Sequence, residues 1–171
     1  MAYSLEIDNR IGNGVYVFLD NRRIDTLRAA GKTEYPLDGG PHIFHCRIIG
    51  RISEIVRIGE GAGGAVRIVC DVRKRSEFLK TDDRRVSVLA PARENPTWVL
   101  VPILLMIEFL FASLVYLSMP AERWTGTNVF WFAAVVLAFL LGLPVLGLAI
   151  ARKAAARPLP PSMVPDLRLA S

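Results

Sequence analysis

Two long apolar runs near the C-terminal end constrain this 171-residue chain more than any other feature. Residues 98–119 form a run of 22 with one charged side chain, Glu108, and residues 129–151 form a run of 23 with none. At about 1.5 Å per residue, a helix over the first run is roughly 33 Å long, enough to cross a hydrocarbon core of about 30 Å. A helix of this length inside a soluble domain normally carries a polar stripe. We therefore predict a transmembrane hairpin, with residues 120–128 as its external turn.

Basic residues flank both runs on the same side of this hairpin. Residues 73–97 contain seven Lys and Arg and residues 152–157 contain three, whereas the turn contains only Arg123. The positive-inside rule then predicts a two-pass protein of the inner (plasma) membrane with both termini in the cytoplasm. Residues 1–10 lack the apolar stretch of a secretory signal, which agrees with this orientation. The basic residues expected to contact lipid headgroups are Arg73, Lys74, Arg75, Arg84, Arg85, Arg152 and Lys153.

Residues 1–72 alternate apolar and polar side chains with the period of a β-strand. The alternating segments are residues 4–8, 14–20, 32–37, 42–49, 53–58 and 65–72, and turn-forming Gly, Asn and Asp separate them. This pattern predicts a small all-β antiparallel sandwich. Residues 73–97 are expected to form a basic juxtamembrane connector. Residues 152–171, which are rich in proline, are expected to form a disordered cytosolic tail.

Residues 14–49 resemble the PEGA-type β-sandwich. The resemblance rests on VYVFLDNRRI followed by YPLDGGPHIFHCRI, in which a strand ends in a tight turn and a later turn with Pro and His opens the next strand. Asn21 stands where that pattern has glycine, and Gly40-Pro41-His42 reorders the later turn. Such sandwiches also occur joined to membrane helices in uncharacterised bacterial proteins. The resemblance implies a fold and a binding or structural role, and it assigns no catalytic residue.

Some strands keep apolar side chains on their second face as well. One interpretation is that these residues are singly exposed or lie at strand crossovers, which is common. The other is a sheet face that binds a protein partner or a second copy of the chain. The residues of this predicted partner-facing sheet are Tyr16, Phe18, Ile43, Val56 and Val69.

Several motifs resemble nucleotide-binding, thiol or metal sites, but each is better explained by a structural role. Residues 59–64, GEGAGG, lack the following helix that a nucleotide-binding loop requires. Cys46 and Cys70 point inward by strand parity and are expected to be buried thiols in the cytosol, although an oxidising compartment would allow a bridge. His42 and His45 lie on opposite faces of one strand and do not form a metal site. We predict no enzymatic activity, no cofactor, no nucleotide and no nucleic acid ligand.

Glu108 lies near the middle of the first apolar run. A carboxylate there is costly, by at least about 2.5–3.5 kcal/mol, so it is expected to be protonated, to contact another subunit or to line an ion path. If the Glu108 carboxyl group is protonated, Ser113 or water is its expected hydrogen-bonding partner. In the second run, Ala134, Ala138 and Gly142 recur every four residues and form a ridge on which another helix can pack closely, with the first run as the expected partner.

These features predict a non-enzymatic, membrane-anchored accessory or scaffold subunit. Its cytosolic sandwich would bind a protein partner, and its hairpin would dock in a membrane assembly or form a homo-oligomer. The alternative is a small oligomeric channel or transporter component in which Glu108 passes protons or cations.

Overall fold

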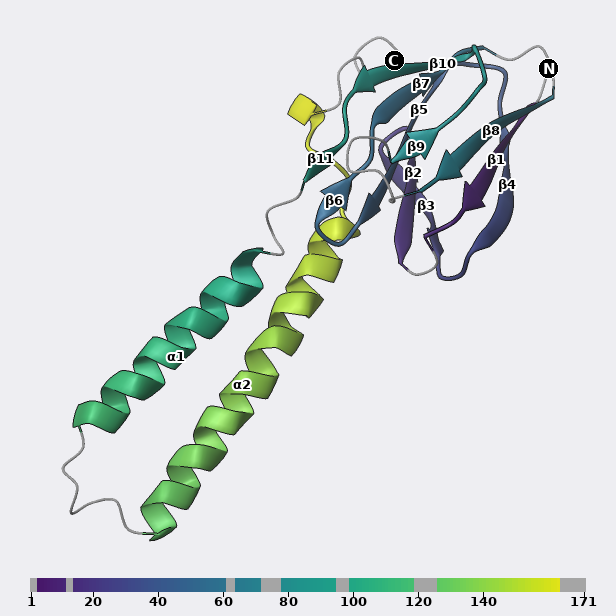
Figure 1. The fold of residues 1–171 in the computed structure, drawn as a ribbon. Helices are drawn as coiled ribbons and strands as arrows, with labels where there is room; N and C mark the ends of the chain where they lie inside the picture. Colours follow the sequence, from purple (N-terminus) through teal and green to yellow (C-terminus); the bar gives the residue numbers. More distant parts are fainter. Residues whose placement is uncertain are drawn as a thin grey trace. The chain divides into compact units, whose positions relative to one another are not determined.

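The computed structural model describes residues 3–11, 14–60, 64–71, 78–94, 99–118 and 126–163 (Figure 1). The chain divides into two compact units. The first comprises Met1–Asn95 together with Ala155–Ser171, and the second comprises Pro96–Ala154. The first unit contains the β-strands and the second contains the long helices.

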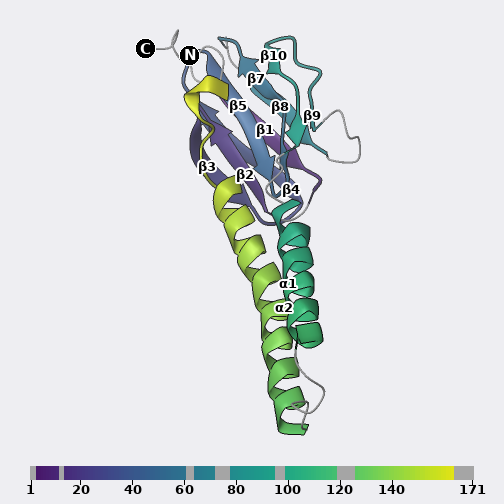
Figure 2. The same ribbon diagram turned by 90° about the vertical axis from the view of Figure 1, so that its left-hand side faces the viewer.

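The first unit is built from two β-sheets, which form its two layers (Figures 1 and 2). The smaller sheet has the order β4-β1-β8-β9, with β1 at Tyr3–Asn9, β4 at Gly31–Leu37, β8 at Ala65–Cys70 and β9 at Leu79–Lys80. The larger sheet has the order β10-β7-β5-β2-β3, with β2 at Val15–Leu19, β3 at Arg22–Leu27, β5 at His42–Ile48, β7 at Ile55–Ile58 and β10 at Val86–Ala90. The short strand β6 (Arg51–Ile52) pairs with β5 and with β11 (Arg93–Glu94).

The predicted antiparallel sandwich differs from the structure in one strand pair and in its boundary. Strands β1 and β8 run parallel, with Leu5 opposite Val66; between them the chain crosses to the larger sheet for β2 and β3, returns for β4 and crosses again for β5 to β7. The strands also continue past residue 72, since β9, β10 and β11 lie in the segment expected to be a connector. Residues 72–77 lie outside the described residues.

The core lies between the two sheets. Leu5 and Ile68 from the smaller sheet and Val17 and Phe44 from the larger one are fully buried in a single apolar cluster. Phe44 and Ile68 lie on the same strand faces as Cys46 and Cys70, which the alternating pattern assigned to the interior. Burial of such side chains is the main favourable term in the stability of a small domain.

The two cysteines meet across this core, as the inward parity of their strands predicts. Cys46 of β5 and Cys70 of β8 are both fully buried free thiols, and their Sγ atoms are 3.7 Å apart. Burial raises the pKa of the Cys46 thiol, with the hydrogen-bonding contact to Cys70 as the second cause. Both residues therefore act as small apolar side chains in the core.

A buried carboxylate links the larger sheet to the start of β9. Glu54, just before β7, accepts hydrogen bonds from the backbone N–H groups of Phe78 and Leu79, each at 2.8 Å. The Arg51 guanidinium lies over the Phe78 ring at 5.7 Å from its centroid. Satisfied buried hydrogen bonds of this kind specify how two layers align.

The second unit contains helix α1 at Leu100–Ser118 and helix α2 at Gly126–Ala155. Among the described residues, α2 is the one helix long and apolar enough to cross a membrane, whereas the corresponding part of α1 is a shorter apolar segment over Pro102–Tyr116. The predicted span at residues 129–151 therefore lies within α2, and the helix continues four residues beyond it. Residues 119–125, which include most of the predicted external turn, lie outside the described residues.

The core position of the two cysteines predicts their reactivity. In the full-length chain in mild detergent, we expect neither thiol to react with a thiol-specific reagent, because both are fully buried and, at Cys46, a raised pKa also removes the reactive thiolate. Both should react after unfolding in guanidinium. The control is Asp38→Cys, at a position whose native side chain is 82% exposed, which should react in the native chain. Labelling of Cys46 or Cys70 as fast as the control would contradict the buried arrangement.

Candidate functional site

The outer face of the larger sheet holds a polar and apolar surface that binds a later segment of the chain. Sequence patterns identified some of its residues but not the surface as a whole. Its centre is the two-residue turn between β2 and β3, formed by Asp20 and Asn21. Both residues have positive φ angles, 51° and 60°, and Leu19 pairs directly with Arg22. A two-residue hairpin with two left-handed residues matches the right-handed twist of its strands, and Asp and Asn tolerate this conformation better than most residues. The turn therefore presents two polar side chains side by side.

Asp20 holds the start of the neighbouring strand β5. Its carboxylate Oδ1 accepts the Ile43 N–H at 2.9 Å, and its own N–H donates to the Ile43 carbonyl at 2.7 Å. Oδ2 lies 2.7 Å from Nδ1 of His42, whose Nε2 lies 2.9 Å from Asp38 Oδ1. Asp20 thus acts within the fold, and it fixes the place from which Asn21 projects.

Asn21 holds the segment that follows helix α2. Its Nδ2 donates to the Leu159 carbonyl at 2.8 Å, and its Oδ1 accepts the Leu159 N–H at 2.9 Å. From strand β5, Nη1 of Arg47 donates to the carbonyl of Arg157. Three hydrogen bonds from the sheet therefore reach the backbone of residues 157–159.

The same segment places an apolar side chain on the sheet. Leu159 is 4% exposed and packs with Ile43, Ile55 and Ala90 in a second apolar cluster. A short 3-10 turn follows at Pro161–Met163, closed by a hydrogen bond from the Met163 N–H to the Pro160 carbonyl. Figures 1 and 2 show this yellow segment along the larger sheet. We call residues 157–163 the return segment.

The return segment corrects two expectations. The tail expected to be disordered from residue 152 begins with the end of α2, and the return segment is ordered on the sheet, because Leu159 is buried there; residues 164–171 lie outside the described residues. The predicted partner-facing sheet is also largely closed within the chain itself. Val56 lies in the core, Ile43 packs against Leu159, and Phe18 is fully buried, whereas Tyr16 and Val69 are half-buried.

A buried histidine lies beside this site. His45 of β5 is opposite Phe18 in the strand register, and the two rings stack with centroids 4.7 Å apart and 4° between planes. His45 is fully buried, and among the described residues neither ring nitrogen has a hydrogen-bonding partner. Burial, and to a smaller extent the nearby Arg47 charge, together lower the pKa of His45 to about 4. Burial lowers the pKa of Arg47 as well.

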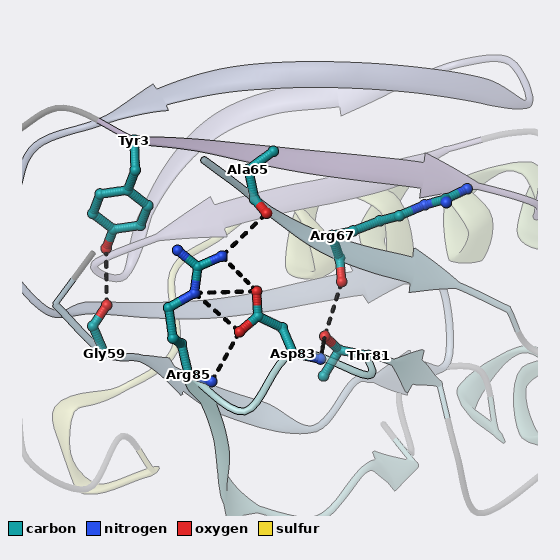
Figure 3. Close-up of polar contacts among 7 residues, drawn as sticks. All are labelled: Tyr3, Gly59, Ala65, Arg67, Thr81, Asp83 and Arg85. Carbon is teal, nitrogen blue, oxygen red and sulfur yellow. Dashed lines mark hydrogen bonds and ion pairs between the residues drawn. The ribbon is translucent and has the colours of Figure 1, made fainter. Parts of the chain in front are cut away.

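A second polar network, next to His42 through the Tyr3 ring 6.3 Å away, joins both sheets and contains one predicted headgroup ligand, Arg85 (Figure 3). Its Nη2 donates to Asp83 at 2.6 Å and to the Ala65 carbonyl at 3.1 Å. Hydrogen bonds from Arg85 lower the pKa of Asp83. The Tyr3 hydroxyl donates to the Gly59 carbonyl at 3.2 Å. Arg85 therefore has a role inside the fold, which corrects its assignment to lipid.

The other predicted headgroup residues have different positions. Arg84 is exposed before β10, and Arg152 and Lys153 are exposed in the last turn of α2. Arg73, Lys74 and Arg75 lie outside the described residues.

In the helices, the expected polar pair does not form. Ser113 donates to the Phe109 carbonyl of its own helix at 2.8 Å, because it is five residues from Glu108 and faces another direction. Both carboxylate oxygens of Glu108 are buried without a hydrogen-bonding partner among the described residues. On α2, Ala138 and Gly142 are exposed, and a Cβ at Gly142 would meet no described atom within 4 Å. The Ala134 ridge is thus not packed closely at Gly142 by a described helix of this chain.

Comparison of the chain with protein-family models, with curated proteins and with solved structures gives no match. The resemblance to the PEGA-type sandwich therefore stays a prediction. Within the described residues, no group of three or more His, Cys, Asp or Glu side chains is placed to hold a metal ion. What the described geometry offers is a docking surface for an extended segment, built from backbone-directed hydrogen bonds and one apolar contact.

The buried histidine predicts a dependence of stability on pH. The pKa of His45 is about 4 in the folded chain against 6.5 for a free histidine, so the unfolded chain binds the proton first as the pH falls. The free energy of unfolding is therefore highest above about pH 6.5, where His45 is neutral in both states. It falls by about 3 kcal/mol toward pH 4, because the unfolded chain gains a proton that the folded chain does not. We expect His45→Phe to remove this part of the slope. Urea unfolding in mild detergent, followed by far-ultraviolet circular dichroism, measures it; equal slopes in both proteins would contradict the assignment.

Proposed function

We propose that the protein is a non-enzymatic accessory or scaffold subunit anchored in the inner membrane by both helices, with the sandwich in the cytoplasm. Helix α2 supports the anchor, because 30 residues extend about 45 Å and exceed a hydrocarbon core of about 30 Å. Large apolar side chains are exposed along both helices, among them Phe109, Phe111 and Val145 at 69% each. Lipid or a neighbouring subunit would cover such a surface.

A two-pass arrangement is supported mainly by one observation: both ends of the helical segment join the same unit, the sandwich. The chain leaves the strands after β11, and the return segment brings it back to the same unit. Arg93 of β11 and Leu159 line one small pocket, together with Ile52, Ile55 and Met163. A domain on one side of a membrane receives both ends of such a segment only after an even number of crossings. Because α2 crosses in this proposal, α1 supplies the second crossing; its 19 residues extend about 28 Å.

Charge sets the proposed orientation. Arg152 and Lys153 lie in the last turn of α2, next to the point where the chain returns to the sandwich. Lysine and arginine beside a transmembrane helix favour the cytoplasmic side. The basic residues that precede α1 favour the same side, so the sandwich is assigned to the cytoplasm.

Two features of the helices support assembly with other membrane helices. Glu108 lacks a hydrogen-bonding partner among the described residues, and an unpartnered carboxyl group inside a membrane is costly. The ridge of Ala134, Ala138 and Gly142 offers a surface on which a helix can approach closely. A polar contact from another subunit would satisfy the Glu108 carboxyl group once the packing that buries its oxygens opens, and the ridge offers that subunit a surface on which to pack.

A second candidate function also rests on Glu108. In an oligomer, the same unpartnered carboxyl group would line a path for protons or cations, as ionisable residues within membranes often do. The two proposals differ in what a neutral substitute does at this position.

Cysteine labelling tests the proposed topology. In intact cells, we expect a membrane-impermeant maleimide to label Thr127→Cys, near the start of α2, from outside. Asp38→Cys, in the sandwich, should be labelled only after the membrane is permeabilised. The native cysteines are buried and form the background control. Labelling of Asp38→Cys in intact cells would overturn the cytoplasmic assignment, and protection of Thr127→Cys until permeabilisation would overturn the crossing.

Substitutions at Glu108 separate assembly from conduction. If the carboxyl group acts as a neutral hydrogen-bonding contact between subunits, Glu108→Gln keeps the native complex size in mild detergent and Glu108→Leu reduces it. If the group carries ions, Glu108→Gln abolishes proton or cation flux in proteoliposomes while the complex size is unchanged. Ser113→Ala is the matched control, because its hydroxyl bonds its own helix. Unchanged assembly in both variants, with no flux in the native protein, would remove both roles.

A further inference from the structure

We propose that Asn21, Arg47 and the apolar patch of Ile43 and Ile55 form a recognition site for an extended leucine segment flanked by prolines, and that the return segment is its ligand in cis. This inference concerns the sandwich alone. It goes beyond the proposed membrane function and does not require it.

The chemistry of the return segment suits this role. Its sequence from residue 157 is Arg-Pro-Leu-Pro-Pro-Ser-Met, and prolines at 158, 160 and 161 carry no backbone N–H. Leu159 is therefore the single residue among 158–161 that offers both a donor and an acceptor. A residue before proline is restricted to extended conformations, which applies to Arg157 and to Leu159. The segment thus loses little conformational entropy on binding.

The site is complementary to that one residue. A primary amide has a donor and an acceptor side by side, and Asn21 directs Nδ2 to the Leu159 carbonyl at 2.8 Å and Oδ1 to the Leu159 N–H at 2.9 Å. These contacts reproduce, with one side chain, the pair of bonds that a neighbouring β-strand makes. Arg47 binds the carbonyl of Arg157, and Leu159 fills the apolar patch. Backbone contacts set the register, and the leucine supplies the buried apolar area.

The identity of residue 21 supports recognition over simple turn formation. With a φ of 60°, this position favours glycine, which adopts a left-handed conformation without strain. Asparagine is tolerated at such a position, and its side-chain amide binds Leu159. The contact with the return segment therefore gives a reason for an amide at a position that favours glycine.

The occupant to which the observations commit is this chain's own segment. The return segment belongs to the same compact unit as the strands and is joined to them covalently, so it binds intramolecularly and does not depend on the concentration of a free ligand. A modest intrinsic affinity is then enough to keep the site filled. While it is filled, Ile43 and Ile55 are covered; when it opens, they form an exposed apolar patch.

Hydrogen exchange at the Leu159 amide is the first test, made on the full-length chain in mild detergent. In the native protein, this amide should exchange slowly because Asn21 Oδ1 accepts it. Asn21→Gly keeps the turn and removes both hydrogen bonds, so exchange at Leu159 should accelerate at least about tenfold. The Ile68 amide in the core should be unchanged, and it reports whether the variant is folded. Asn21→Asp keeps an acceptor and loses the donor, and should lie between the two. Exchange at Leu159 that is already unprotected in the native protein would overturn the proposal.

Binding in trans is the second test, and it does not depend on the folding of an Asn21 variant. Leu159→Asp in the full-length chain should vacate the site. A fluorescent peptide with the sequence of residues 156–163 should then bind this variant saturably, with a Kd in the millimolar range or below. Binding to the native chain should be at least tenfold weaker, because its site is filled. A peptide carrying the same leucine-to-aspartate change is the matched control.

Two outcomes of this second test would overturn the proposal. One is the absence of saturable binding to Leu159→Asp up to about 10 mM peptide, above the millimolar effective concentrations typical of tethered ligands. The other is equal binding of the native and control peptides. Either result leaves the topology experiment unaffected, so failure of this site is distinguishable from failure of the membrane anchor.

Discussion

The two-residue turn at Asp20 and Asn21 connects parts of the chain that are far apart in sequence. Through Asp20 it fixes the start of β5, the strand in the middle of the larger sheet. Through Asn21 it binds Leu159, which lies 138 residues further along the chain. Both functions depend on the left-handed backbone of the turn, since that conformation places the two side chains next to each other. The position at which the chain returns to the sandwich therefore depends on the local chemistry of one hairpin.

The rest of the unit is held by contacts between sheets. Cys46 and Cys70 touch at its centre, Glu54 ties the start of β7 to the start of β9, and Arg85 with Asp83 joins the approach to β10 to β8. A small domain buries a limited fraction of its surface, so its apolar core stabilises it only modestly. Fully satisfied polar contacts between the sheets add to that stability. The parallel pairing of β1 with β8 follows the same logic. It brings the first strand into the middle of the smaller sheet, where both of its edges are paired.

Alternation in the sequence predicted the strands whose inner face enters the core and missed those that do not. Leu5 and Ile7 in β1, or Val66 and Ile68 in β8, repeat every second residue because one face of each strand is buried. Strand β3 was missed because it lies at the edge of its sheet and its residues are largely polar or exposed. Strand β10 was missed because it follows a charged stretch and its Val88 is 65% exposed. The parallel pairing of β1 with β8 could not be predicted, because periodicity indicates which face of a strand is buried and not which strand lies next to it.

The docking site shows a related limit of sequence analysis: a pattern within one segment does not show which distant segment packs against it. Apolar residues on the second face of β5 left two interpretations open, single exposure or a covered face, and Ile43 proves to be covered, by Leu159. The pattern could not distinguish a partner protein from a distant part of the same chain, because both remove the same apolar area from water. The prolines around Leu159 favour disorder by composition, although their main effects here are to hold the backbone extended and to isolate one N–H group. A signal was present in the pairing of two local exceptions: an asparagine at a turn position that favours glycine, and a lone leucine between prolines. Neither feature alone predicts a site. The amide of Asn21 and the backbone N–H and C=O groups of Leu159 are complementary, and this complementarity connects the two.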